Sequence, residues 1–172
     1  MKIYRTRLLN EVEPGSLVWA SLTLNTARPI SRLAFRSAEA DSRQVMIAVL
    51  EEIGDPRAFL GYWVAMPPDA LVLDFGHDFL IEPSLSSIQL DSSGFEVGAG
   101  VITLETDGLG IPLLVPTWNR VEGVLNLPSG TLKRRDGRNL GVALHWRLGV
   151  QTTPLSTQWL FDSRAGYLPQ AF

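Results

Sequence analysis

Apolar and polar residues alternate with a period of two over many short stretches of this chain. In residues 16–25, every second side chain from Val18 to Leu24 is apolar, and the side chains between them are mostly polar. Successive side chains of a β-strand point to opposite faces, so this alternation predicts a strand with one buried face. Residues 58–66 are apolar at nearly every position, which predicts a strand covered on both faces. Strand-like patterns also occur in residues 32–37, 70–75, 79–82, 87–90, 95–106, 111–115, 121–127, 140–148 and 158–161.

Clusters of Gly, Pro, Asp and Ser separate these stretches. Turn signals occur at Pro67-Pro68-Asp69, Ser92-Ser93-Gly94, Asp107-Gly108, Ser129-Gly130 and Asp136-Gly137. Many short strands with regular turns are typical of all-β folds. We therefore expect a mainly β protein, either an antiparallel β-sandwich or a jelly-roll or barrel fold, with about 8–12 short strands.

Residues 42–53 fit two interpretations, and both stay open at this point. As a helix, the segment would begin with Asp41 as its N-cap, carry one apolar stripe and end at a glycine. As a strand, it would place the β-branched side chains of Val45, Ile47 and Val49 on one face. Two adjacent glutamates would lie at the negative end of such a helix, which is unfavourable, so a strand is favoured.

Two loops predict β-hairpins. In residues 132–140, the loop Arg135-Asp136-Gly137 places its glycine at the left-handed position that a three-residue loop requires. The loop Gly76-His77-Asp78 would in the same way pair Phe75 with Phe79. Both loops carry charged or titratable residues, so their tips are also candidate sites.

Length and charge limit the kinds of partner. The 172 residues fit a single domain over residues 1–172, with enough chain to bury its own core. The net charge of −3 and the pI of about 5.4 argue against a nucleic-acid partner. The chain has no Cys, which excludes disulfides, thiolate metal sites and Cys nucleophiles.

No apolar stretch approaches the roughly 20 residues needed to cross a bilayer. The basic N-terminal residues are not followed by the apolar run of a signal peptide. We therefore expect a soluble protein without a membrane partner, located in the cytoplasm or within an assembled particle. Thirteen of the fifteen basic residues are Arg, a bias that fits the GC-rich genome of a bacterium or phage.

His77 is the first catalytic candidate, because Asp74, Asp78 and Glu82 lie near it in the sequence. A neutral imidazole beside carboxylates can bind a divalent metal or act as a general base. Catalytic zinc usually takes three protein ligands, and no spacing here shows a convergent set. A polar loop tip is the favoured interpretation, with His77, Asp74 and Asp78 kept as weak catalytic candidates and no metal or cofactor expected.

Residues 140–148 predict a single strand. Its apolar face would carry Trp146, and its opposite face would carry His145 and Arg147. His145 could meet His77 in space, but a half-buried, hydrogen-bonded histidine is the favoured interpretation.

Five tryptophans is a high count for a chain of this size. The residues that would share a strand face with Trp63 and Trp146 are apolar, so we expect both tryptophans in the core. Trp19, Trp118 and Trp159 are binding candidates, since exposed Trp side chains stack on sugar rings or anchor protein interfaces. If both faces of the sheet are covered, these three side chains would belong to the core as well.

A basic cluster surrounds the tip of the hairpin predicted in residues 132–140. It could bind phosphate or an acidic partner, although a solvated turn is favoured in an acidic chain. Its members are Lys133 and the candidate binding residues Arg134, Arg135 and Arg138.

Three functional hypotheses remain. The chain lacks the serine-hydrolase elbow, the phosphate-binding loop and the dinucleotide-binding loop, so enzymatic activity is left open but not favoured. The first hypothesis is a non-catalytic structural or protein-interaction module that contacts other protein chains, as a homo-oligomer or a subunit of an assembly such as a phage particle. The second is a protein that binds a sugar or an apolar molecule through the three candidate tryptophans. The third is a hydrolase or metal enzyme centred on His77 and its two aspartates.

Overall fold

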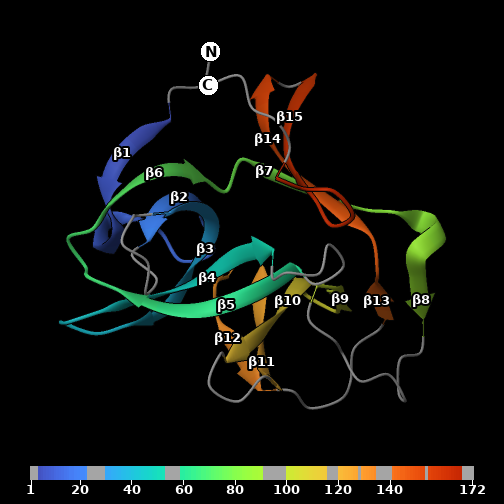
Figure 1. Cartoon of the computed structure of the whole chain (residues 1–172), viewed down its shortest axis with the longest axis horizontal. Helices are drawn as coiled ribbons and strands as arrows, with labels where there is room; N and C mark the ends of the chain where they lie inside the picture. The colour runs from blue at the N-terminus through green and yellow to red at the C-terminus, as the bar shows by residue number, and fades with distance from the viewer. Residues whose placement is uncertain are drawn as a thin grey trace.

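The computed structural model of the protein describes residues 4–22, 30–52, 59–90, 100–115, 120–127, 129–134, 141–153 and 155–167. These residues form a mainly antiparallel, sandwich-like β fold, which confirms the predicted class (Figure 1). Two short 3-10 helices, η1 (Leu9–Glu11) and η2 (Leu85–Ser87), interrupt the strands. The strands are β1 (Arg5–Leu8), β2 (Leu17–Leu22), β3 (Ile30–Ala40), β4 (Val45–Glu52), β5 (Phe59–Met66), β6 (Leu71–Gly76), β7 (Phe79–Pro83) and β8 (Ile88–Leu90). They continue with β9 (Ile102–Glu105), β10 (Gly108–Val115), β11 (Arg120–Leu127), β12 (Leu132–Arg134), β13 (Gly141–Ala143), β14 (Trp146–Thr153), β15 (Ser156–Asp162) and β16 (Gly166–Tyr167).

The larger sheet forks at β10. Its main path runs β1-β6-β2-β3-β4-β5-β10-β9-β13-β8, and β11 and β12 extend from the other side of β10. One side of β10 pairs with β9 at Gly108–Gly110 and with β5, in parallel, at Leu113 and Leu114. The end strands β1 and β8 do not pair with each other in the part of the chain that is described, so this sheet does not close into the barrel considered from the sequence.

The smaller sheet, β16-β15-β14-β7, packs across the larger one and gives the fold its two layers. The main core lies between the sheets and combines Leu33 and Phe35 of β3 with Leu148 of β14 and Phe161 of β15. A second core lies on the opposite face of the N-terminal strands, where Leu9 and other apolar residues cover it. Alternate residues of β2 and β3 therefore face different cores, so these strands are covered on both sides.

The segment with two interpretations is the strand β4, as favoured. Its two antiparallel neighbours, β3 and β5, hold it inside the larger sheet. Val45, Ile47 and Val49 face the second core, and Ala48 and Leu50 face the main core. The alternative interpretation, a helix over residues 42–53, is therefore wrong for Val45–Glu52, because burial on both sides of the strand outweighs the helical pattern.

Both predicted hairpins are wrong. β12 pairs with β11, whereas β13 has β9 on one side and β8 on the other, so the strands that flank residues 135–140 are not neighbours. The loop residues 135–140 themselves lie outside the described part of the chain. β6 belongs to the larger sheet and β7 to the smaller one, so the loop around His77 joins two layers. Turn chemistry alone does not reveal which strands are neighbours.

The single strand predicted for residues 140–148 is divided. A bend at Leu144 and His145 separates β13, in the larger sheet, from β14, in the smaller sheet. The described residues contain sixteen strands instead of the 8–12 expected, because this division adds one strand and short strands such as β1 and β16 were not predicted. None of the helices within the described ranges has the length and apolar character required to cross a membrane.

Candidate functional site

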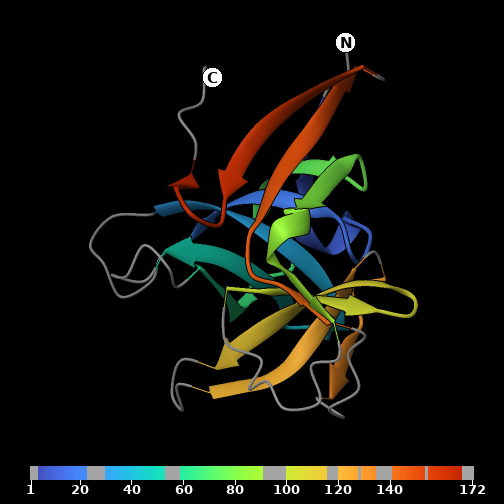
Figure 2. The same cartoon turned by 90° about the vertical axis from the view of Figure 1, so that its right-hand side faces the viewer.

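The chain crosses between the two sheets twice at one place. One crossing runs from β7 through η2 to β8, and the other runs from β13 through the bend at Leu144 and His145 to β14. β7 pairs with β14 in the smaller sheet, and β8 pairs with β13 in the larger sheet. The two crossings therefore lie side by side and run in opposite directions, as Figure 2 shows where η2 and β8 face the viewer.

Hydrogen bonds to Ser84 and Ser87 hold the two crossings together. The backbone N–H of Ser84 donates to the carbonyl of His145 at 2.8 Å, and the N–H of Leu144 donates to the carbonyl of Ser87 at 3.3 Å. The N–H of His145 donates to the Ser87 hydroxyl at 3.0 Å, and that hydroxyl lies within donor distance of the carbonyls of Ser84 and His145. This network fixes the backbone where regular strand pairing stops.

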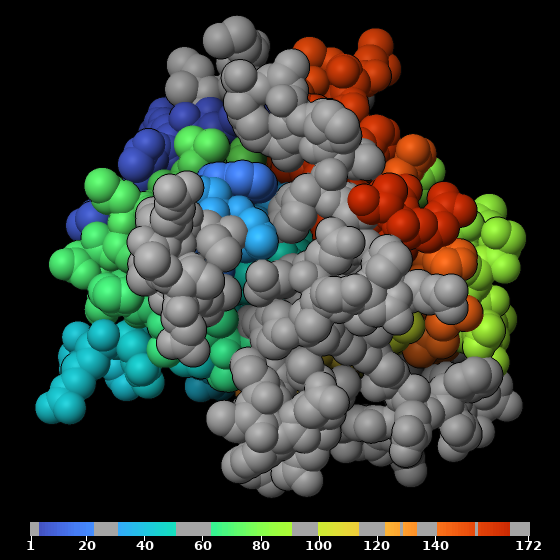
Figure 3. Space-filling model, viewed as in Figure 1, coloured from blue at the N-terminus to red at the C-terminus, as the bar shows by residue number. Residues whose placement is uncertain are grey.

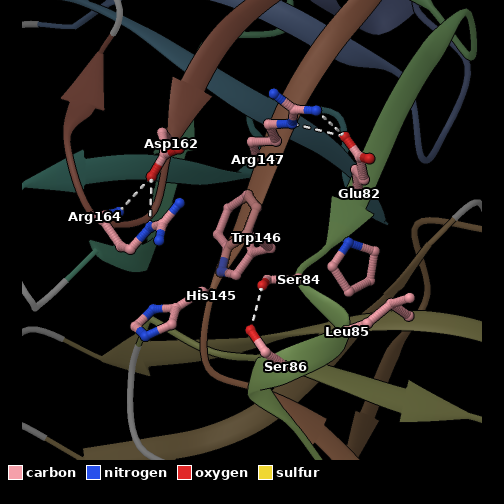
Figure 4. Close-up of a pocket in the computed structure, with 10 residues that line it drawn as sticks. Glu82, Ser84, Leu85, Ser86, His145, Trp146, Arg147, Asp162 and Arg164 are labelled. Atoms are coloured by element: carbon pink, nitrogen blue, oxygen red, sulfur yellow. Dashed lines mark hydrogen bonds and ion pairs between the residues drawn. The ribbon is translucent and has the colours of Figure 1, made fainter.

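A pocket of ≈ 450 Å³ opens at this crossing (Figure 4). Its walls come from residues 82–86, residues 145–147, Asp162 and Arg164. The volume lies within the roughly 300–1,000 Å³ typical of small-molecule sites. The turn that carries Asp162 and Arg164 is tied to β14, since the N–H of Trp146 donates to the Ser163 hydroxyl at 2.9 Å.

Arg147 is the central charged residue on the outer face of the smaller sheet. Its Nε donates to Oε2 of Glu82 at 2.6 Å, across the β7–β14 pair. Its guanidinium also lies 3.9 Å from the ring centroid of Trp159 on β15. Gly149 leaves room for that ring, because a Cβ there would lie 2.9 Å from Cε3 of Trp159. The positive charge of Arg147 is thus paired with a carboxylate and stacked on an aromatic face.

A second pair of opposite charges lies at the other wall. The N–H of Arg164 donates to Oδ1 of Asp162 at 2.8 Å, and the Arg164 Nε lies 3.7 Å from the same oxygen. The Arg164 side chain is largely exposed. Together with Glu82 and Arg147, this pair makes the formal charges around the pocket cancel when His145 is neutral.

The three catalytic candidates do not form one site. Asp74 and Asp78 line a separate pocket of ≈ 200 Å³, where Asp74 lies 3.5 Å from Nε of Arg7. His77 lines a different cavity, and its Nε2 lies 3.6 Å from a carboxylate oxygen of Glu13. No group of three His, Asp or Glu side chains in the described segments could hold a metal ion.

His145 does not meet His77 either, because the two histidines line different cavities. The favoured interpretation of a half-buried, hydrogen-bonded His145 is also wrong, since its side chain is exposed. Within the described ranges, its ring takes part in no hydrogen bond, and only its backbone groups are bonded. The bend that divides the predicted strand turns this side chain out toward the pocket.

The candidate tryptophans separate in the same way. Trp19 packs against the main core, as do Trp63 and Trp146, which were expected there. Trp159 lies beneath the Arg147 guanidinium and does not line the pocket. Trp118 falls outside the described residues. The predicted binding face of three tryptophans is thus not assembled from the two that are described.

Only part of the basic cluster falls within the described residues. The Lys133 ammonium donates to the two carboxylate oxygens of Asp107 at 2.7 and 2.8 Å. Arg134 ends β12, and Arg135 and Arg138 lie outside the described residues. The lysine of this cluster is thus engaged within the protein.

Sequence reasoning missed most of the pocket residues, among them Ser84, Ser86, Asp162 and Arg164. No local signal marks these residues. The pocket lining as a whole comes from three separate segments that only the tertiary structure brings together. The fold and the pocket define an all-β, sandwich-like protein with an open polar pocket where the chain crosses from one layer to the other. Comparison with known proteins finds no matching family model, no matching curated protein and no matching solved structure.

Proposed function

We propose that this protein is a non-catalytic interaction module that associates with a second copy of itself through the outer edge of β8. The observation that carries the proposal is that, among the described residues, β8 (Ile88-Gln89-Leu90) is an uncharged edge strand whose terminal leucine is 71% exposed. An unpaired strand edge offers N–H and C=O groups that can pair with a strand of another chain.

The other edges in the described part of the chain carry features that discourage such pairing. β1 contains Arg5 and Arg7, and β12 contains Lys133 and Arg134. β7 contains a glutamate and a proline, and β16 has only two residues. Charged residues and prolines are a usual protection of free edges, and β8, although itself only three residues long, has neither. The contrast supports β8 as the edge used for association.

Exposed leucines surround this edge. Leu85 in η2 is 85% exposed, and Leu144, whose N–H bonds to the carbonyl of Ser87, is 38% exposed. Figure 3 shows residues of this segment at the surface along one side of the molecule, in yellow-green. Large apolar side chains gathered at a surface are typical of protein interfaces.

A second copy is the partner that fits the edge with fewest assumptions. Two copies of β8 paired in the antiparallel sense are related by a two-fold axis, so each chain offers the same surface to the other. The strand has no charge to repel its copy. The same contact would also suit a subunit of a larger assembly, such as a phage particle.

Light scattering coupled to size exclusion, over a series of protein concentrations, tests the proposal. We expect a dimer that dissociates on dilution, and we expect Leu90→Lys to leave a folded monomer. Leu71→Lys is the matched control, since Leu71 is 65% exposed but lies on β6, between β1 and β2. A wild-type protein that stays monomeric at the highest concentration, or a dimer unaffected by Leu90→Lys, would refute the proposal.

A further inference from the structure

The pocket at the crossing exposes both donors and acceptors of hydrogen bonds. The His145 imidazole and the guanidinium of Arg164 lie at one wall, and the hydroxyls of Ser84 and Ser86, 3.1 Å apart, lie at the other (Figure 4). Asp162 uses Oδ1 to accept the N–H of Arg164, and its Oδ2 accepts no hydrogen bond within the described residues. A ligand here would meet donors and acceptors within one small volume.

The balance of charge selects against an ionic ligand. Glu82 faces Arg147, and Asp162 faces Arg164, so neither sign is in excess around the pocket. An ion of either sign would lie near both carboxylates and both guanidiniums, so attraction and repulsion largely offset each other. The pocket therefore offers no net charge to attract an ion, which favours a neutral ligand.

Hydroxyl groups match such walls well. Each hydroxyl donates one hydrogen bond and accepts others, so a polyol can bond to a carboxylate and a guanidinium at the same time. Bonds to ionised partners are the stronger ones. Apolar surface from Pro83 and the 85% exposed Leu85 can pack on the C–H face of a sugar ring.

From these contacts we infer that the pocket between the two crossings binds a small neutral polyhydroxy ligand of the saccharide class. This inference does not require association through β8, although Leu85 both lines the pocket and is one of the exposed leucines near that edge. It keeps the sugar ligand that the sequence suggested and moves the site from the candidate tryptophans to the crossing.

Nuclear magnetic resonance titration of the full-length protein provides the test. The probes are neutral mono- and disaccharides (glucose, galactose, trehalose and maltose), with succinate and spermidine as charged probes. The reporters are the His145 imidazole protons and the Trp146 Nε1–H, which donates to the carbonyl of Gly100 at 2.9 Å. We expect at least one neutral saccharide to shift both reporters saturably, with a Kd on the order of 1 mM.

Variants locate the binding. We expect Arg164→Ala to weaken saccharide binding by about tenfold, the loss of one charge-assisted hydrogen bond. Arg43→Ala is the matched control, because Arg43 is exposed and lies outside the pocket, and its Kd should equal that of the wild type. Circular dichroism establishes that both variants are folded. Stronger shifts with succinate or spermidine, no shift with any saccharide, or equal weakening by both variants would each overturn the inference.

Discussion

The hydroxyl of Ser87 accepts the backbone N–H of His145 at 3.0 Å, a bond that joins residues 58 positions apart in the sequence. Each of these residues lies where the chain passes between the two sheets. Ser87 is buried but His145 is exposed, so the bond is partly shielded from water. One small side chain thus holds together the two crossings that form the walls of the pocket.

Replacing this hydroxyl should destabilise the fold. In Ser87→Ala, the N–H of His145 loses its acceptor in a part-buried hydrogen bond, which typically costs about 1 kcal/mol. We expect the free energy of unfolding, measured by urea denaturation, to fall by that amount. Ser86→Ala is the control, because Ser86 is exposed and, among the described residues, its hydroxyl bonds only to the Ser84 hydroxyl. That variant should change stability by less than about 0.5 kcal/mol. Equal effects of the two variants would show that the Ser87 bond has no special role.

The stacking of Arg147 on Trp159 should be measurable as a coupling energy. A double-mutant cycle with Arg147→Ala and Trp159→Ala should give about 0.5–1 kcal/mol, the range for exposed cation–π pairs. A parallel cycle with Arg164→Ala and Trp159→Ala should be additive within about 0.5 kcal/mol, because Arg164 does not stack on that ring. Additivity in the first cycle would mean that the stacked geometry contributes nothing to stability.

Arg36 is a buried arginine whose Nε is left without a hydrogen bond by the described residues around it. Its residue is 8% exposed, and its Nε has no hydrogen-bond partner in the described structure. Burial lowers the pKa of this guanidinium. We expect Arg36→Met, which keeps the apolar stem, to leave the free energy of unfolding unchanged or to raise it by up to about 1 kcal/mol. Arg43→Met, at an exposed position, should be neutral. A loss of more than about 1 kcal/mol in Arg36→Met would reveal a favourable partner for the charge.

The pair of Lys133 and Asp107 should make one carboxyl titrate at low pH. The hydrogen bond from the Lys133 ammonium lowers the pKa of Asp107 below its ordinary value. A lowered pKa in the folded state means that the pair stabilises the protein above the unfolded pKa. The stabilisation is then lost as the pH falls through the folded pKa. We expect Lys133→Met to raise the titration midpoint of Asp107, followed by carbon-detected magnetic resonance, whereas Lys133→Arg should keep it low. An unchanged midpoint in Lys133→Met would exclude the ammonium as the cause.

Much of the strand content could be predicted because it depends on local patterning. In β2, the alternation around Val18 and Ala20 places these side chains in the second core, as expected. The same alternation could not show that Trp19, on the opposite face, is covered by the main core. A strand's pattern reports which residues are apolar, whereas the cover on its second face comes from strands distant in the sequence.

The candidate site could not be predicted for a related reason. Asp74, His77 and Asp78 are neighbours in the sequence, yet the histidine lines a different cavity from the two aspartates. Ser84 and Arg164 are far apart in the sequence and meet at one pocket. Nearness along the chain and nearness in space differ most where strands change sheets.

By itself, the sequence determined that the chain is mainly pleated and which faces of several strands are apolar. Those features follow from side chains pointing alternately to opposite sides of an extended backbone. Only the tertiary structure decided the strand order, the division of residues 140–148 into β13 and β14, and the assembly of the pocket from three segments. Backbone N–H and C=O groups are the same at almost every residue, so the choice of pairing partner is made by the packing of the whole fold.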